Sequence, residues 1–258
     1  MVADVMLYKV SAVGLSDVGL VRQNNEDVWA QLPDINFFIL ADGMGGHQAG
    51  EVAARHAVDD ICHTLSRRDA SEYHKMTLKA VEDQLKKAIR HANTFIFKLG
   101  RSNREYRGMG TTLCCLQFHP EGVIYAHVGD SRIYRLRDGT LTQLTKDHSL
   151  LSELIEQGEI KADQIFDFQF KNIITKAVGT ESKVDPETTI SDVRIGDTYL
   201  ICSDGLSDLL SPQEITQVLS SRSELSMMAE TLVAKANRKG GRDNITAILA
   251  KIDPCDAS

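Results

Sequence analysis

The chain has 258 residues, 42% hydrophobic and 25% charged, which is ordinary for a globular protein and ample for a substantial core. Its formal net charge of −7 and the lack of a basic block argue against nucleic acid or an anionic membrane as the main partner. No apolar run approaches the ~18 residues that a membrane helix requires.

The five cysteines are odd in number and form no C-x-x-C pair, which argues against a disulfide or zinc framework. Three of them lie in apolar, strand-like runs, so we expect reduced core residues. The N-terminus lacks the basic-then-apolar plan of a signal peptide. These features together predict a soluble, cytoplasmic protein.

The first third of the chain predicts strands over residues 6–13 and 28–32, separated by a polar segment. A third, buried strand over 37–41 stops at Asp42, and three glycines follow within the next four residues. Apolar residues at helical spacing then predict a helix over 51–65. Taken alone, Asp42 is also compatible with an ordinary Asp-Gly turn.

A charged, loop-like stretch over 66–75 leads into a long amphipathic helix over 74–99. Gly100 is expected to end that helix. Four strands follow with turn residues between them, and the Asp-Gly pair before the fourth is a strong hairpin signal. We predict these strands over 111–118, 123–128, 132–137 and 141–145.

Residues 146–190 have mixed character, with a short helix near 150–157 and an aromatic patch over 166–170. The last third of the chain predicts a strand, two helices and a final strand. Their ranges are 198–202, 212–220, 225–238 and 245–252. This order favours an α+β fold with two mainly antiparallel sheets packed face to face and a helix pair on each outer face, in an α-β-β-α sandwich. We expect one domain over residues 1–258.

Acidic residues recur where the predicted strands end. Asp42 and Asp204 each close a strand directly before a glycine, and Asp243 follows two glycines and precedes a strand. Asp130 stands between two strands, and Glu26–Asp27 precede another. Because strand ends gather at the rim of a sandwich, these acids can converge on one cleft. Hard divalent cations such as Mg²⁺ or Mn²⁺ would relieve the repulsion between them.

The order and spacing of these residues resemble the metal-dependent serine/threonine protein phosphatases of the type 2C family, in particular its bacterial members. Eight short motifs occur in the order of the family across nearly the whole chain, which makes a chance resemblance very improbable. They are Arg22-x-x-x-Glu26-Asp27, Asp42-Gly43-Met44-Gly45-Gly46-His47, Gly108-Met109-Gly110-Thr111-Thr112, Val128-Gly129-Asp130-Ser131-Arg132, Lys146-Asp147-His148-Ser149, Ile174-Thr175-Lys176-Ala177-Val178-Gly179, Ser203-Asp204-Gly205-Leu206 and Asp243-Asn244-Ile245-Thr246.

The resemblance implies two Mn²⁺ or Mg²⁺ ions and assigns their ligands. Asp42 bridges both ions, and Gly43 lends its carbonyl oxygen to one of them. Asp204 and Asp243 hold the other ion. Asp130, with Asp204, contributes to a weaker third metal site seen in bacterial members.

The resemblance also implies roles around the ions. Glu26 binds a metal-coordinated water with support from Asp27, and Arg22 grips the substrate phosphate, which suits a bidentate guanidinium. Residues 146–172 form a flap beside the cleft. Met44 stands where many eukaryotic relatives have a histidine assigned as general acid, and a thioether donates no proton. A metal-bound water or His47 are the remaining candidates, although His47 can equally shape the glycine loop.

Several of these residues also have simpler interpretations. Arg22 can be a plain surface arginine, and Asp130 can cap a turn. Asn244 is expected to stabilise the loop of Asp243 rather than to contact substrate. Asp147 and Asp208 are interpreted as flap or surface residues, and Thr111–Thr112 as residues that either orient Asp42 or pack.

The activity implied is hydrolysis of phosphoserine and phosphothreonine in proteins by a water that two metals activate, in opposition to a serine/threonine kinase in bacterial signalling. We expect a monomer with phosphoproteins as partners. The alternatives are a silent relative that only binds phosphoproteins, another two-metal phosphoesterase such as a nuclease, and a cysteine-dependent phosphatase using the C-x5-R spacing of Cys62 and Arg68. The last is disfavoured because the spacing lies on an amphipathic helix without glycine.

Overall fold

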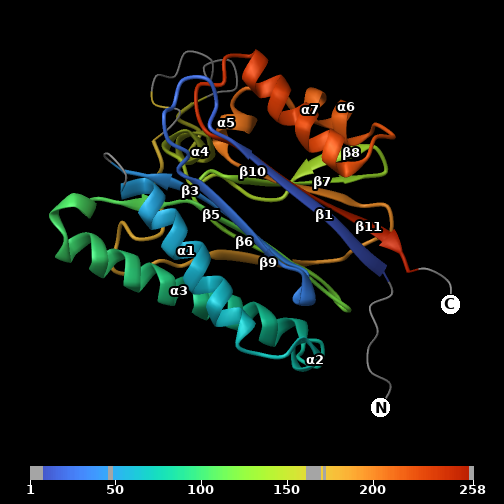
Figure 1. Ribbon diagram of the computed structural model, residues 1–258, viewed down its shortest axis with the longest axis horizontal. Helices are drawn as coiled ribbons and strands as arrows, with labels where there is room; N and C mark the ends of the chain where they lie inside the picture. Colours follow the sequence, from blue (N-terminus) through green and yellow to red (C-terminus); the bar gives the residue numbers. More distant parts are fainter. Residues whose placement is uncertain (1–7, 46–48, 161–169, 171–172, 256–258) are drawn as a thin grey trace.

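The computed structural model describes residues 8–45, 49–160, 170 and 173–255. Two antiparallel sheets face each other, and helices cover the outer face of each sheet (Figure 1). The predicted fold class, a four-layer sandwich of helices, two sheets and helices, is therefore confirmed.

The first sheet places both ends of the described chain side by side. Its spatial order is β1 (Tyr8–Asp17), β11 (Ile245–Pro254), β10 (Thr198–Cys202), β7 (Arg132–Arg137) and β8 (Thr140–Gln143). All neighbours in this sheet are antiparallel, and β1 pairs with β11 along its whole length, from Tyr8 opposite Pro254 to Asp17 opposite Ile245.

The second sheet carries Asp42 and Gly43 near the end of its strand β3. Its spatial order is β2 (Asp27–Leu32), β3 (Phe37–Met44), β5 (Leu113–His119), β6 (Gly122–Val128) and β9 (Glu187–Ser191), and β4 (Gly110–Thr111) pairs with the end of β3. These pairs are also antiparallel.

Helices cover both outer faces. α1 (Ala49–Ser66) and α3 (Leu78–Ser102) pack on the second sheet, and α6 (Pro212–Leu219) and α7 (Leu225–Arg238) pack on the first (Figure 1). The remaining helices are short: α2 (Ala70–Tyr73), α4 (Leu150–Glu156), α5 (Asp204–Ser207) and the 3-10 turns Pro33–Ile35 and Arg104–Tyr106.

Strand β3 shows why its sequence is apolar throughout. Phe37 and Ile39 face the helices, whereas Phe38 and Leu40 pack between the two sheets. Since successive side chains of a strand point to opposite faces, a strand covered on both sides needs an uninterrupted apolar run. The run ends at the rim of the sandwich, where Asp42 begins the site.

Five expectations about the elements are wrong. α3 begins at Leu78 because the Thr77 hydroxyl caps it by accepting the Ala80 N–H, 3.2 Å away, and it continues past Gly100 to Ser102. The stretch expected to be a loop before it contains α2. β1 extends to Asp17 rather than ending near residue 13. β9 was missed because its residues are half-exposed or exposed and show no strict alternation.

The expectation that three cysteines are reduced core residues is confirmed. Cys114, Cys115 and Cys202 are buried thiols, whereas Cys62 is half-buried and Cys255 is exposed, and none is in a disulfide. Within the described residues, no helix is both long enough and apolar enough to cross a membrane.

Candidate functional site

The pairing of β2 with β3 places the first two acids of the site opposite each other. Asp27 lies directly across from Asp42 in the register, and the Gly43 N–H donates to the Glu26 carbonyl oxygen at 3.1 Å. A Cβ atom at Gly43 would lie 2.2 Å from the carbonyl oxygen of Gly50. Glycine is therefore required where the first turn of α1 packs against the end of β3.

Two threonines fix the backbone of Asp42. The Asp42 N–H donates to the Thr112 hydroxyl at 3.1 Å, and the Asp42 carbonyl accepts from the Thr111 hydroxyl and the Thr112 N–H, both at 2.8 Å. Thr112 in turn shares a hydrogen bond of 2.7 Å with the Ser131 hydroxyl. Of the two interpretations of Thr111–Thr112, the structure supports orientation of Asp42.

The loops that carry Asp204 and Asp243 are in direct contact. A Cβ atom at Gly205 would lie 2.0 Å from the Asn244 carbonyl oxygen and 3.3 Å from the Asp243 Cβ. The Asn244 side chain accepts from the Glu26 N–H at 2.8 Å and donates to the carbonyl oxygens of residues 18 and 24. Asn244 thus ties the loop that precedes β2 to the start of β11.

Asp27 lies behind this junction and is buried. Its Oδ2 accepts from the Ser203 hydroxyl at 2.8 Å and from the Thr246 hydroxyl at 2.6 Å, whereas its buried Oδ1 has no hydrogen-bond partner among the described residues. Burial raises the pKa of Asp27 to about 6. Neither Ser203 nor Thr246 was predicted as a site residue, although both lie in the motifs that suggested the family.

Burial and mutual repulsion raise the proton affinity of the other acids. The pKa of Asp42 lies well above its usual range, first because of desolvation and then because Asp27 and Asp204 are close. Desolvation and the charge of Asp130 raise the pKa of Asp204 to about 8. Desolvation likewise raises the pKa of Asp130 to about 6, and it raises the pKa of Glu26.

These acids offer only oxygen ligands, and the buried Asp130 Oδ1 also has no partner among the described residues. A group of carboxylates that repel one another, with unpartnered oxygens, has the chemistry that Mg²⁺ and Mn²⁺ prefer. The residues present therefore fit divalent cations.

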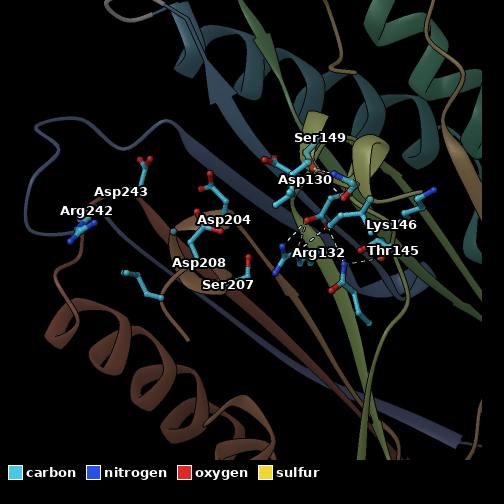
Figure 2. Close-up of a pocket in the computed structure, with 17 residues that line it drawn as sticks. Asp130, Arg132, Thr145, Lys146, Ser149, Asp204, Ser207, Asp208, Arg242 and Asp243 are labelled. Carbon is cyan, nitrogen blue, oxygen red and sulfur yellow. Dashed lines mark hydrogen bonds and ion pairs between the residues drawn. The ribbon is translucent and has the colours of Figure 1, made fainter. Parts of the chain in front are cut away.

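A pocket of about 760 Å³ opens beside the acids. In the view of Figure 2, Asp204 and Asp243 lie on one side of this pocket, and Asp130, Arg132 and Lys146 lie on the other. The walls come from α5, the loop that precedes β11, the start of β7, and α4 with the segment that leads into it. The pocket is large enough for a phosphorylated side chain and part of its flanking peptide.

Arg22 lies at the edge of this arrangement. Its side chain is 52% exposed, and its Nη2 lies 2.7 Å from the Asp243 Oδ2. The arginine thus brings a positive charge next to the acidic group while about half of its side chain stays accessible to solvent.

Two predicted features fall partly or wholly outside the described residues. His47 lies outside them, as does most of the predicted flap beyond residue 160. The described part of the flap enters through Ser149, which pairs with Ile174, and continues into α4. Met44 ends β3 opposite Gly110.

The interpretation of Asp147 as a surface or flap residue is wrong in part. Its side chain is only 11% exposed, and its carboxylate accepts three hydrogen bonds from Arg132, between 2.6 and 3.0 Å long. Asp208 is exposed as expected, but it lines the pocket and helps to raise the pKa of Asp204, after desolvation and Asp130. Only the folding of the chain brings these pairs together, so spacing gave no signal.

The cysteine-dependent alternative does not fit the structure. Cys62 lies on α1, and burial together with Asp59 raises the pKa of its thiol to about 11. Arg68 lies beyond the end of the same helix. A thiol that stays protonated at neutral pH is a poor nucleophile.

Comparison with known proteins identifies the family. The family model described as protein phosphatase 2C matches residues 17–250. The chain belongs to the protein phosphatase 2C family. The serine/threonine phosphatase stp of Listeria welshimeri is 38% identical over 239 residues, which cover 92% of this chain and 93% of that protein. The family resemblance expected from the eight motifs is thereby confirmed.

Solved structures of similar proteins agree with the fold of this phosphatase. The serine/threonine phosphatase PstP/Ppp of Mycobacterium tuberculosis is 36% identical, with a TM-score of 0.85, and the match covers 95% of this chain and 99% of that one. A structure of the PstP catalytic domain in complex with two manganese ions is 36% identical, with a TM-score of 0.83, and the match covers 95% and 98% of the two chains.

Proposed function

We propose that this phosphatase hydrolyses phosphoserine and phosphothreonine in proteins with two Mn²⁺ or Mg²⁺ ions bound among its acids. The observation that carries the proposal is the buried group of carboxylates with raised pKa values beside a pocket, in a chain of this family. When bound, such ions lower the pKa of a coordinated water and stabilise negative charge on a phosphoryl group.

The ligands proposed are those that the fold brings together. Asp42 would contact both ions, the Gly43 carbonyl oxygen would contribute to one, and Asp204 and Asp243 would hold the other. Asp130 would serve a third, weaker site, and its unpartnered buried oxygen supports that role.

The remaining site residues would act around the ions. Glu26 would bind a water coordinated to one of the ions, and Asp27 would support it. The hydrogen bonds from the Ser203 and Thr246 hydroxyls keep the Asp27 carboxylate fixed. Asn244 would hold the Glu26 backbone in place.

Arg22 would bind the substrate phosphate. Its present partner is Asp243, and a cation on that carboxylate would take over much of the electrostatic interaction. The guanidinium would then be available for a bidentate contact with two phosphate oxygens. The exposed position of Arg22 at the edge of the site suits a residue that meets the substrate first.

We further propose that residues 1–258 form one catalytic domain that acts as a monomer in the cytoplasm and opposes a serine/threonine kinase. The shared buried cluster between the two sheets supports a single domain. The acidic net charge and the absence of a basic block support phosphoproteins rather than nucleic acids as substrates.

The test is release of phosphate from a phosphothreonine peptide by the purified full chain, with and without Mn²⁺, with Asp42→Asn as the matched inactive variant. We expect turnover that requires Mn²⁺, survives alkylation of the cysteines and falls to background in the variant. Metal-independent turnover that alkylation abolishes would contradict the proposal. Tight Mn²⁺ binding in calorimetry without turnover on any phosphopeptide would instead indicate a silent relative.

A further inference from the structure

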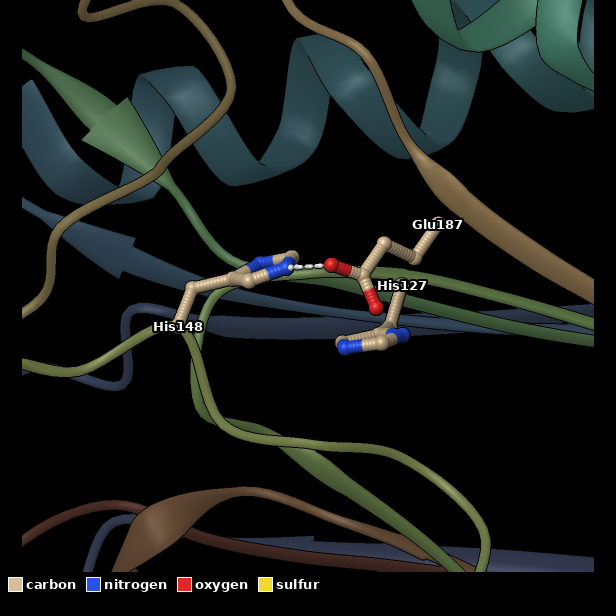
Figure 3. Close-up of side chains that lie close together, drawn as sticks. All are labelled: His127, His148 and Glu187. Carbon is tan, nitrogen blue, oxygen red and sulfur yellow. Dashed lines mark hydrogen bonds and ion pairs between the residues drawn. The ribbon is translucent and has the colours of Figure 1, made fainter. Parts of the chain in front are cut away.

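Two stacked histidines lie beside the loop that carries Asp130. The rings of His127, on β6, and His148, which follows β8, are 4.7 Å apart at an angle of 10°, and Glu187 of β9 contacts His148 (Figure 3). One ligand atom from each residue lies within 4.8 Å of the others, a spacing that a metal ion could use. The hydrogen bonds of the two rings show whether their nitrogen atoms are available to coordinate a metal ion.

The hydrogen bonds of His148 oppose a metal. The Gly129 N–H donates to the His148 Nδ1 at 3.0 Å, so Nδ1 carries no proton. Nε2 therefore carries it and donates to the Glu187 Oε1 at 2.9 Å. Both ring nitrogens of His148 are thus engaged, and a cation at Nε2 would force a proton onto Nδ1 against the Gly129 N–H.

His127 supports the same conclusion. Its Nε2 lies 2.7 Å from the Lys146 carbonyl oxygen, which only accepts, so Nε2 is the protonated nitrogen. Burial lowers the pKa of His127, which keeps the stacked ring neutral. The two histidine rings therefore form hydrogen bonds with backbone groups, the Lys146 carbonyl and the Gly129 N–H, rather than coordinate a cation.

The backbone that His148 holds is that of Gly129. The His148 N–H also donates to the Gly129 carbonyl oxygen at 2.9 Å, so the two residues bind each other reciprocally. Gly129 has φ +103°, and a Cβ atom there would lie 2.7 Å from the Thr112 Cβ. Gly129 is therefore confined between His148 and Thr112, and Thr112 is the residue that fixes Asp42.

Asp130 depends on this confinement. Its side chain is buried, and its Oδ1 has no partner in the described part of the chain, so no side-chain contact of that oxygen fixes its direction. The residues on either side of it are held instead, Gly129 through its backbone bonds to His148 and Ser131 through the bond between its hydroxyl and that of Thr112.

We propose that His148 is a positioning residue that holds Asp130 at the wall of the catalytic pocket and ties it to the segment entering α4. This proposal rests on the proposed function, in which Asp130 binds a divalent cation. His148 itself lies on the segment that enters α4, so its ring contact joins that segment to Gly129. The His148 carbonyl oxygen also accepts from the Thr175 N–H at 2.9 Å, next to the pairing of Ser149 with Ile174, which holds the segment in place.

Three variants separate the two ring contacts of His148. His148→Asn keeps an acceptor, Oδ1, close to the position of Nδ1 and loses the reach to Glu187. His148→Ala loses both contacts. Glu187→Gln keeps an acceptor for the Nε2 proton and is the matched control.

The first readout is amide hydrogen exchange at Gly129 in the metal-free full chain, which needs neither substrate nor activity. Loss of one buried acceptor should raise the exchange rate about tenfold in His148→Ala. We expect His148→Asn and Glu187→Gln to stay within about threefold of the wild type. Exchange at Gly129 that is unchanged in His148→Ala would overturn the proposal even if the wild type is a fully active phosphatase.

The second readout is the Mn²⁺ concentration at half-maximal activity. It should rise about tenfold in His148→Ala and return toward the wild-type value in His148→Asn, as expected for one hydrogen bond to a buried group. In an Asp130→Ala background, the His148→Ala change should add almost nothing, because both act on the same group. Additive effects of the two changes would show that His148 acts elsewhere and would overturn the proposal.

Nitrogen-15 NMR of the histidine rings tests the competing metal site. We expect His148 to be protonated at Nε2 alone and unaffected by one equivalent of Zn²⁺. A shift of both rings on Zn²⁺ addition, with one binding site lost in His148→Ala, would overturn the proposal in favour of a metal centre. These spectra come from the metal-free protein, so their outcome is independent of whether the chain hydrolyses phosphopeptides.

Discussion

Strands β7 and β10 lie side by side and carry acids at both ends, but the two ends treat those acids differently. At one end, Asp204 follows β10 and Asp130 precedes β7. At the other end, Asp197 precedes β10, next to Arg137 at the end of β7. The acids at both ends are aspartates that flank the same two strands, and all of them are at least partly buried.

At the end of these strands that carries Asp197, here called the far end, protein groups neutralise the charge of the carboxylate. The Asp197 carboxylate accepts from the Arg137 Nε and Nη2 at 2.7 and 2.6 Å, from the Arg194 N–H at 2.9 Å and from the Tyr199 hydroxyl at 3.3 Å. Its oxygens are satisfied, and its charge is paired, which is what a buried carboxylate requires in a stable fold.

At the end that carries Asp204 and Asp130, here called the near end, neither carboxylate has a paired arginine like that of Asp197 among the described residues. The pKa values of Asp204 and Asp130 rise to about 8 and about 6, mainly through desolvation, and other carboxylates add repulsion. The fold therefore tolerates a destabilising group at one rim that it avoids at the other. We attribute that difference to function rather than stability, because the divalent cation proposed for this site would supply the missing positive charge.

The largest effect is expected at the near end. Asp204→Asn should lower phosphatase activity at fixed Mn²⁺ by about 10³-fold, since loss of a charged ligand removes several kcal/mol of stabilisation. The same change should leave the metal-free protein as stable as the wild type at pH 8, or more so, because it removes a repelling charge. Phosphate release and thermal unfolding of the metal-free protein measure the two effects.

Asp208→Asn is the matched control for this prediction. Asp208 is an exposed neighbour that also lines the pocket but follows the strand end by several residues. Its loss should change activity far less. A variant of Asp204 that kept most of its activity, or that unfolded well below the wild type without metal, would contradict the comparison.

The second effect is expected at the far end and has the opposite character. Asp197→Asn leaves the largely buried Arg137 with its charge less compensated, which should lower the free energy of unfolding by about 3 kcal/mol. For a chain of this size that corresponds to a melting temperature lower by ~6–12 °C. Activity per folded molecule at 20 °C should stay within about twofold of the wild type. Asp253→Asn, at a half-buried acid on β11 that pairs with Lys251, supplies the control for loss of one negative charge.

The two rims also show what the sequence can and cannot predict. Asp42 and Asp204 were found because an apolar run that stops at Asp-Gly is a local signal for a strand end. Their convergence followed from the sandwich, where strand ends meet at a rim. Asp243 has a different local signal, because it follows two glycines and precedes a strand.

Pairs that form across the fold gave no local signal. Arg132 and Asp147 lie 15 positions apart, and Gly129 and His148 lie 19 apart, on segments whose adjacency depends on the order of the strands. β9 was missed for a related reason, because an edge strand that is largely exposed needs no apolar periodicity. Sequence patterns thus predict the acids near the strand ends but not the contacts that hold those acids in place.

The smallest effect concerns pH and tests whether the near end is uncompensated. The folded-state pKa of Asp204, about 8, lies above the ordinary value near 4 that it takes in the unfolded chain. The folded protein therefore holds a proton that the unfolded chain has lost, and this stabilisation disappears as the pH rises through 8. Between pH 7 and 8, the metal-free wild type should lose about 1 kcal/mol, or ~2–4 °C in melting temperature.

Asp204 titrates within the window from pH 7 to 8, and Asp42, whose pKa is also raised well above its usual range, adds a slope of the same sign. Asp27 and Asp130, with pKa values of about 6, have mostly lost their protons by pH 7. Asp204→Asn should reduce the slope by the share that Asp204 contributes, whereas Asp197→Asn should retain the full slope at a lower melting temperature. Saturating Mn²⁺ should invert the slope in the wild type, because cations compete with protons for the same oxygens and gain affinity as the acids ionise. A metal-free melting temperature that stays flat from pH 7 to 8 would mean that the charge at the near rim is already balanced, and the contrast between the two rims would fail.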